Sequence, residues 1–204
     1  MKKKYKVLLA CLIILFIGCE KRNFFPDEDD PGLSRLTSRG YNIATMYINK
    51  IPYINLYQKP LFGGINNRVP TINVISTNSA FDTLQISWEI EINDSSNSYN
   101  RPYNSISLLI PVSKNFTVHD FLAMSGKRLP FDSNTITLNS FDNYSDTLAG
   151  KSNLYLVNIR YNLPVNSSTG TYSLSGLFSG NIGDSILITK GRFDFEIDAD
   201  KVKF

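Results

Sequence analysis

The sequence predicts an all-β fold, an antiparallel β-sandwich or flattened barrel, with one short helix. Apolar and polar residues alternate from 84 to 92. A period of two, with one face of the strand exposed to solvent, is typical of an antiparallel strand. Many short runs of this kind follow one another, with turn residues between them. Only residues 117–124 have a helical pattern, with Thr117 as the expected cap and Asp120 in the first turn.

The first two strands are predicted at 42–48 and 51–57. Asn49 and Lys50 lie between them and are expected to form the tight turn of a hairpin. Pro52 cannot donate a backbone hydrogen bond, which favours an edge position for the second strand.

The remaining strands are separated by a polar loop at 93–104 and by turns such as 166–170 and 179–184. They are predicted at 71–77, 81–92, 105–110, 134–139, 153–161, 171–179 and 185–197. No repeat of fixed period is apparent, which argues against a solenoid or a propeller.

The last predicted strand contains a glycine, Gly191, among β-branched and aromatic residues. An isolated glycine in a strand marks a bulge or a close approach of two backbones. Arg192 and Asp194 fall on one face of this strand, and Phe193 falls on the other. We therefore predict a structural closing strand whose charged side chains lie in solvent.

Residues 1–18 have the organisation of a bacterial lipoprotein signal peptide. A lysine cluster is followed by an apolar run and by Gly18, directly before Cys19. A transmembrane helix is the alternative, but it needs roughly 20 apolar residues and only about a dozen are present. The sequence therefore predicts cleavage before Cys19 and lipid attachment to its sulfur.

Residues 19–40 contain charge clusters and two prolines without sustained periodicity, which predicts a flexible, lipidated tether. The all-β domain is expected to span residues 41–204. Once Cys11 is removed with the signal and Cys19 is lipidated, no cysteine remains for a disulfide. A domain of this size can be stable through its core alone.

The apparent positive charge belongs to the signal peptide. The chain has 21 Lys+Arg and 18 Asp+Glu, and four of the lysines precede Cys19, which leaves 17 basic and 18 acidic residues. A net charge of −1 lacks the basic stripe of a nucleic-acid-binding surface. Nucleic acid is therefore not an expected partner.

Two stretches together resemble a group of uncharacterised small lipoproteins of Gram-negative bacteria. They are the hairpin at 43–53 and the run Ile-Thr-Lys-Gly-Arg-Phe-Asp at 188–194. In that group the hairpin reads roughly Ile-Asn-Gly-x-x-Trp, whereas this chain has Lys50 at the glycine position and Tyr53 at the tryptophan position. The resemblance implies an all-β surface lipoprotein and supplies no activity.

The sequence offers little catalytic chemistry. His119 is the only histidine, and neither a Gly-x-Ser-x-Gly motif nor a His/Cys cluster for zinc occurs. Glu89 and Glu91 share a predicted strand face about 7 Å apart, which is within the range of an inverting glycosidase pair. Alternating glutamates are commoner as a solvated face, so we predict no enzyme, no catalytic residue, no cofactor and no metal.

The polar loop at 93–104 is the predicted ligand contact. Tyr99 and Tyr103 offer rigid aromatic area, and Arg101 offers hydrogen bonds. The alternative is that both tyrosines pack against the end of the sheet.

Three tripeptides of the type Asp-Thr-Leu or Asp-Ser-Ile resemble an acceptor pattern for bacterial periplasmic O-glycosylation. They make Thr83, Thr147 and Ser185 candidate attachment sites.

These features predict a non-enzymatic binding or accessory module, held in the cell envelope at the outer membrane by its lipid anchor. A polysaccharide or another envelope protein is the expected partner besides the membrane. Two alternatives stay open: a carbohydrate-active enzyme or enzyme inhibitor, and a pilus or adhesin subunit that exchanges an edge strand with its neighbour.

Overall fold

The computed structural model describes residues 26–56, 70–92, 103–130, 132, 134–140, 147–163 and 169–204. The predicted signal peptide and Cys19 lie outside these ranges. Within them, no helix is long and apolar enough to cross a membrane.

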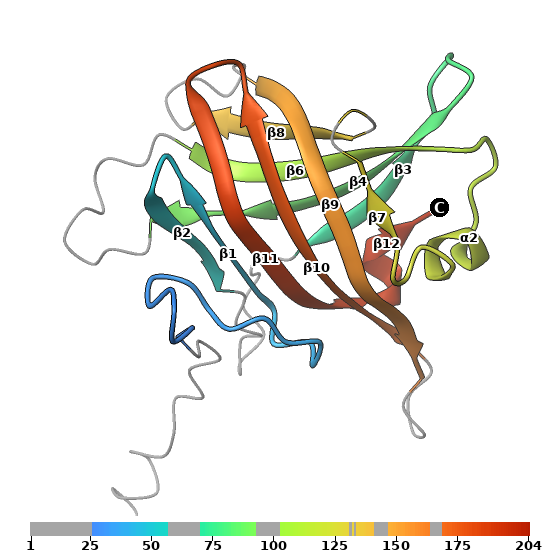
Figure 1. The fold of residues 1–204 in the computed structure, drawn as a ribbon. Helices are drawn as coiled ribbons and strands as arrows, with labels where there is room; N and C mark the ends of the chain where they lie inside the picture. Colours follow the sequence, from blue (N-terminus) through green and yellow to red (C-terminus); the bar gives the residue numbers. More distant parts are fainter. Residues whose placement is uncertain are drawn as a thin grey trace, which may run out of the picture.

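The described strands form one curled sheet (Figure 1). Its order is β12-β3-β4-β6-β8-β9-β10-β11-β1-β2-β5, and the two-residue strand β7 pairs with β9. All pairs are antiparallel except β12 with β3, which confirms the predicted all-β class. The strands are β1 (Ile43–Ile48), β2 (Ile51–Leu56), β3 (Thr71–Ile75), β4 (Asp82–Glu89), β5 (Glu91–Ile92), β6 (Tyr103–Val112), β7 (Arg128–Leu129), β8 (Thr135–Ser140), β9 (Thr147–Asn162), β10 (Thr171–Ile182), β11 (Ile186–Asp198) and β12 (Val202–Lys203).

The two ends of this sheet meet at one corner. Only Ile90 separates β4 from β5, yet β5 pairs with β2 at the opposite end of the strand order. The side-chain amide of Asn55 on β2 also donates to the carbonyl of Glu89 on β4, at 2.7 Å. The sheet is therefore strongly curled, consistent with the predicted β-sandwich or flattened barrel.

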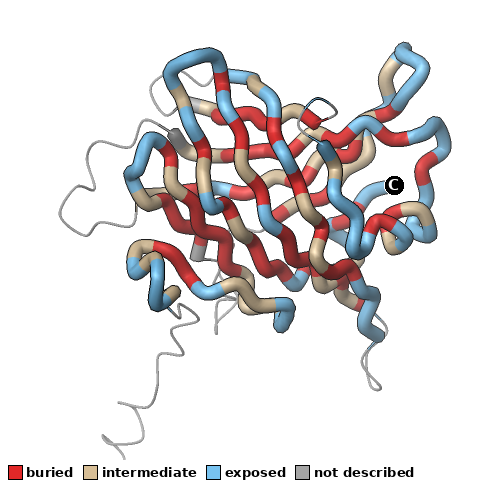
Figure 2. The backbone as a smooth tube through the Cα atoms, viewed as in Figure 1, coloured by how far each residue is buried: buried red, intermediate tan, exposed pale blue. Residues whose placement is uncertain are grey.

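The core lies inside the curl and follows the period of two. On β4, Leu84, Ile86 and Trp88 are buried and the residues between them are partly exposed, an alternation that Figure 2 shows along the neighbouring strands as well. The centroid of the Trp88 ring lies 5.4–5.6 Å from the centroids of Phe178, Phe193 and Phe195. Large aromatic rings thus supply much of the apolar surface of a disulfide-free core.

The predicted helix forms as α2 (Val118–Leu122). Thr117 caps it in a capping box, in which its side chain accepts from the Asp120 backbone N–H and the Asp120 side chain accepts from the Thr117 N–H. Phe121 is buried, and its ring packs against Tyr172 and Phe204. The helix therefore covers core residues at one end of the barrel. A single 3-10 turn, η2 (Ala199–Lys201), links β11 to β12.

The predicted hairpin turn between β1 and β2 is confirmed, and the backbone of both its residues, Asn49 and Lys50, is left-handed. Asn49 has φ of 50° and Lys50 has φ of 68°, which is the signature of a type I′ turn. Asn49 also binds the β10–β11 turn: its N–H donates to the Leu187 carbonyl, its side-chain oxygen accepts from the Leu187 N–H, and its amide donates to the Ser185 carbonyl. Lys50 is exposed.

Lys50→Gly is expected to stabilise the protein by about 1 kcal/mol, because a left-handed conformation costs an L-residue about that much and costs glycine almost nothing. Thermal unfolding should show a midpoint a few degrees higher. Lys50→Ala is the matched control, since it removes the same side chain but keeps the Cβ atom. An equal gain in both variants would trace the effect to the lysine side chain and contradict the backbone explanation.

The segment from 26 to 41 lies against the outer face of the sheet, and we call it the strap. Leu33 is fully buried in it, and two further buried residues, Ile43 on β1 and Ile54 on β2, lie outside the main core. Gly32 approaches Pro52 and Tyr47. Residues 26–41 are therefore docked on the sheet, in contrast to the flexible tether that the sequence predicts. A segment without a hydrophobic period can dock in this way when one apolar side chain is buried and its polar groups find hydrogen-bond partners.

Candidate functional site

The strap is fastened to two charged residues of β11. Asp194 is 2% exposed, and its carboxylate accepts hydrogen bonds from the Thr37 hydroxyl and from the backbone N–H groups of Arg39, at 3.1 Å, and Gly40, at 2.8 Å. Arg192 donates to the carboxylate of Asp27 at 2.6 Å. The prediction that these charges lie in solvent is therefore wrong: the strap supplies the partners that water would otherwise provide.

The charges across this contact shift two pKa values. The pKa of Asp27 is lowered, chiefly by its hydrogen bond from Arg192, and the pKa of Lys190 is raised, chiefly by its hydrogen bond to Asp30. The ionised Asp27 carboxylate therefore stabilises the folded protein at every pH above its unfolded pKa of about 3.9. This stabilisation is lost as the pH falls through the lower pKa that Asp27 has in the folded protein. The Lys190 contribution is present below about 10.4 and is lost as pH rises through the higher folded value.

Gly191 lies beside a bulge, which is one of the two explanations that an isolated strand glycine predicts, but the group that approaches it is a side chain and not a second backbone. A Cβ atom at this position would lie 2.6 Å from the ring of Phe178, its partner on β10. The register between β10 and β11 shifts directly before Gly191 along β11, where Lys190 has φ of 51°. The glycine therefore makes room for a core ring at the point where Lys190 and Arg192 flank the outer surface.

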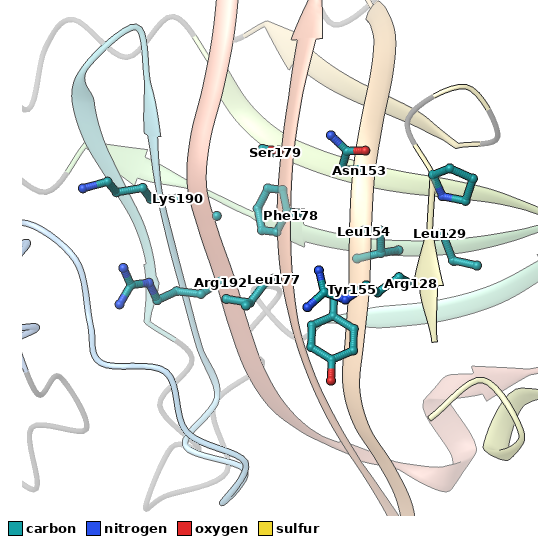
Figure 3. A pocket seen from close by; sticks show the side chains of 12 residues that line it. Arg128, Leu129, Asn153, Leu154, Tyr155, Leu177, Phe178, Ser179, Lys190 and Arg192 are labelled. Atoms are coloured by element: carbon teal, nitrogen blue, oxygen red, sulfur yellow. The ribbon is translucent and has the colours of Figure 1, made fainter. Parts of the chain in front are cut away.

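A groove of about 720 Å³ crosses the outer face of β9, β10 and β11 beside this bulge. Figure 3 shows Lys190 and Arg192 on one side of it and Arg128 and Leu129 of β7 on the other. Its lining consists of Arg128, Leu129, Pro130, Asn153, Leu154, Tyr155, Leu177, Phe178, Ser179, Lys190, Gly191 and Arg192. Because β7 pairs with β9, three strand spacings of about 4.8 Å separate the two sides, roughly 14 Å in all.

The floor of the groove combines apolar and hydrogen-bonding surface. Tyr155 is half-buried, and Leu177 is 37% exposed although it is apolar. The guanidinium carbon of Arg128 lies 4.7 Å from the centroid of the Tyr155 ring, within cation–π range. Asn153 and Ser179, which are paired neighbours on β9 and β10, add an amide and a hydroxyl group.

The three cations of the groove differ in their partners. Lys190 pairs with Asp30 at 2.7 Å, and Arg192 pairs with Asp27 at 2.6 Å. Arg128 is exposed and has no carboxylate within ion-pair distance among the residues that the structure describes. An anionic group entering the groove would therefore meet one cation without a counter-charge.

The titratable groups of the groove lining are Tyr155, Lys190 and the two arginines, Arg128 and Arg192. None of its residues is Asp, Glu, His or Cys, and the described ranges hold no group of three or more such residues that could bind a metal ion. His119 is exposed on α2. Glu89 ends β4 and Glu91 begins β5, and neither lines the groove.

The structure does not describe the ligand contacts predicted from the sequence. Tyr99, Arg101 and the side chain of Tyr103 lie outside the described residues.

The three candidate glycosylation sites lie in different surroundings. Thr83 is half-buried within β4, where its backbone pairs with β3 and β6. Thr147, at the start of β9, and Ser185, in the β10–β11 turn, are exposed. Glycosylation of these residues stays a prediction.

Sequence reasoning missed the groove. Its residues come from four strands spread over residues 128–192, and β7 is too short to show any periodicity. The sequence did contain one indication of it. Asn153 and Tyr155 are two positions apart in the strand predicted at 153–161, so a polar and an aromatic side chain share the outward face of that strand.

No protein-family model matches the chain, and the searches of curated proteins and of solved structures find no match either.

Proposed function

We propose that this chain is a non-enzymatic binding module of the bacterial cell envelope, anchored by lipid on Cys19, and that its groove binds saccharide chains. The observation that supports the ligand class is the floor of the groove. Tyr155 and Leu177 offer apolar surface for the C–H faces of sugar rings, and Asn153, Ser179 and Arg128 surround it with hydrogen-bonding groups. Binding sites commonly combine apolar walls with a few such polar groups.

The size and chemistry of the groove favour a saccharide over a folded protein partner. A stable protein interface usually buries more than about 1,000 Å² with an apolar centre. Here the exposed or half-exposed apolar side chains of the groove are those of Leu129, Pro130, Tyr155 and Leu177, and they lie between charged residues.

Tyr155→Ala is expected to weaken saccharide binding at least about tenfold, as removal of a central aromatic contact usually does. The measurement is a glycan array followed by calorimetry, with the mature chain carrying Cys19→Ser so that it is recovered without membrane. Tyr161→Ala is the matched control, because Tyr161 is a half-exposed tyrosine of the same strand outside the groove.

Binding by wild type and Tyr161→Ala, but not by Tyr155→Ala, supports the proposal. It fails if no saccharide is retained, or if both tyrosine variants lose binding equally. Retention of a protein instead of a saccharide would also contradict it, and shortening of the bound saccharide would show an enzyme.

A further inference from the structure

The first residues of the strap form a closed acidic turn that contacts the charged ends of Lys190 and Arg192, on the β11 side of the groove. The Asp27 N–H donates to the Leu33 carbonyl at 2.9 Å, and the Leu33 N–H donates to the Asp30 carbonyl at 2.8 Å. Pro26 and Ser34 form an isolated bridge across the turn. The backbone therefore presents the carboxylates of Asp27 and Asp30 as a pair.

These two carboxylates occupy one cationic side of the groove. Asp30 accepts two hydrogen bonds from the Lys190 ammonium group, at 2.7 and 2.9 Å, and lies 3.7 Å from the Arg192 guanidinium. Asp27 accepts from Arg192. The other two acids of the turn do not take part in this contact, since Glu28 pairs with Arg35 and both of these side chains are exposed.

We propose that this acidic turn is a built-in competitor for the groove, and that the groove's ligand is an extended anionic saccharide. The inference rests on the proposed function and names both the ligand class and its regulation. Carboxylate or sulfate groups of the ligand take the places of Asp27 and Asp30 on Lys190 and Arg192, while another anionic group of the same chain meets Arg128.

The exchange starts at Lys190, which is the exposed part of the contact, whereas the side chains of Arg192, Asp27 and Asp30 are each less than a quarter exposed. The Lys190 side chain is 54% exposed, and ion pairs at such surfaces contribute little. The strap has further fastenings at the buried Leu33 side chain, at the Ser34–Thr45 hydrogen bond and at Asp194. The turn can therefore leave Lys190 without detaching the strap.

The width of the groove sets the length of the ligand. About 14 Å separates the β7 side from the β11 side, by three strand spacings. A single sugar ring cannot reach both, whereas an oligosaccharide can. An acidic oligomer is thus expected to bind more tightly than its monomer.

The test compares two double variants with the same change in net charge. Asp27→Asn with Asp30→Asn frees Lys190 and Arg192, whereas Glu28→Gln with Asp29→Asn alters only the acids of the turn that do not pair with these cations. The probes are a decameric oligogalacturonate, monomeric galacturonate and the methyl-esterified decamer, which has the same backbone without charge.

We expect the first double variant to bind the charged decamer about fivefold more tightly than wild type does, since it removes the competing ion pairs. The control variant should change affinity by less than about twofold. Adding Lys190→Gln to the first variant should cancel the gain, and monomer and esterified decamer should bind weakly to every variant. Melting curves confirm that each variant is folded.

Equal gains in both double variants would show a general charge effect and overturn the inference, as would the lack of any gain. If wild type binds neutral saccharides through Tyr155 but no variant prefers the charged decamer, the competitor inference fails while the proposed function stands. If no saccharide of either kind binds, both fail.

Discussion

Asp194→Ala is expected to destabilise the domain by about 3 kcal/mol and to release the strap, because it leaves buried donors without an acceptor. The Asp194 carboxylate accepts from the backbone N–H groups of Arg39 and Gly40 and from the Thr37 hydroxyl, with almost no access to water. Denaturant unfolding measures the loss of stability. Limited proteolysis should show new cleavage between residues 26 and 41.

Glu196→Ala is the control for this experiment. Glu196 lies two positions further along β11 and is exposed, and its side chain accepts one hydrogen bond, from Thr171 at 3.0 Å. Surface changes of this kind usually alter stability by no more than about 0.5 kcal/mol. A similar, small effect of both substitutions would mean that Asp194 does not fasten the strap.

Gly150→Ala is expected to cost about 3 kcal/mol or more, or to prevent folding, because there is no room for a methyl group. A Cβ atom at Gly150 on β9 would lie 2.0 Å from the carbonyl oxygen of Asn181 and 2.6 Å from the Cα of Ile182. Both are backbone atoms of β10, so no side-chain rotation relieves the clash and the strands themselves must separate. Expression yield and thermal unfolding report the effect.

Gly183→Asn provides the comparison. Gly183 has φ of 57°, which asparagine tolerates, and nothing lies within 4 Å of its Cβ direction. This variant should melt within a few degrees of wild type. If Gly150→Ala does the same, the close approach of β9 and β10 is not as the structure places it.

The sheet could be predicted from the sequence because its signals are local. Alternation over a few residues gave most strands, and paired turn residues gave the hairpin at Asn49 and Lys50. Gly191 was informative for the same reason, since a glycine within a β-branched run has few structural explanations.

The strap could not be predicted because its contacts join distant parts of the chain. Asp27 meets Arg192 across 165 positions, and Thr37 meets Asp194 across 157. Prolines and clustered charges are also what a tether contains, so composition alone cannot separate the two. The groove could not be predicted for a related reason. Arg128 lies over the Tyr155 ring only because the two-residue strand β7 pairs with β9.

With the lipid that we propose on Cys19, the docking of the strap shortens the connection between the membrane and the domain. Between Cys19 and the start of the strap at Pro26 there are seven peptide units, which span at most about 25 Å, whereas the 22 units to Tyr41 would have spanned about 80 Å. The accessible volume scales with the cube of this length and is therefore on the order of 30-fold smaller. With the proposed lipid anchor and saccharide ligand, this shorter connection would raise the effective concentration of the groove toward saccharide near the membrane surface.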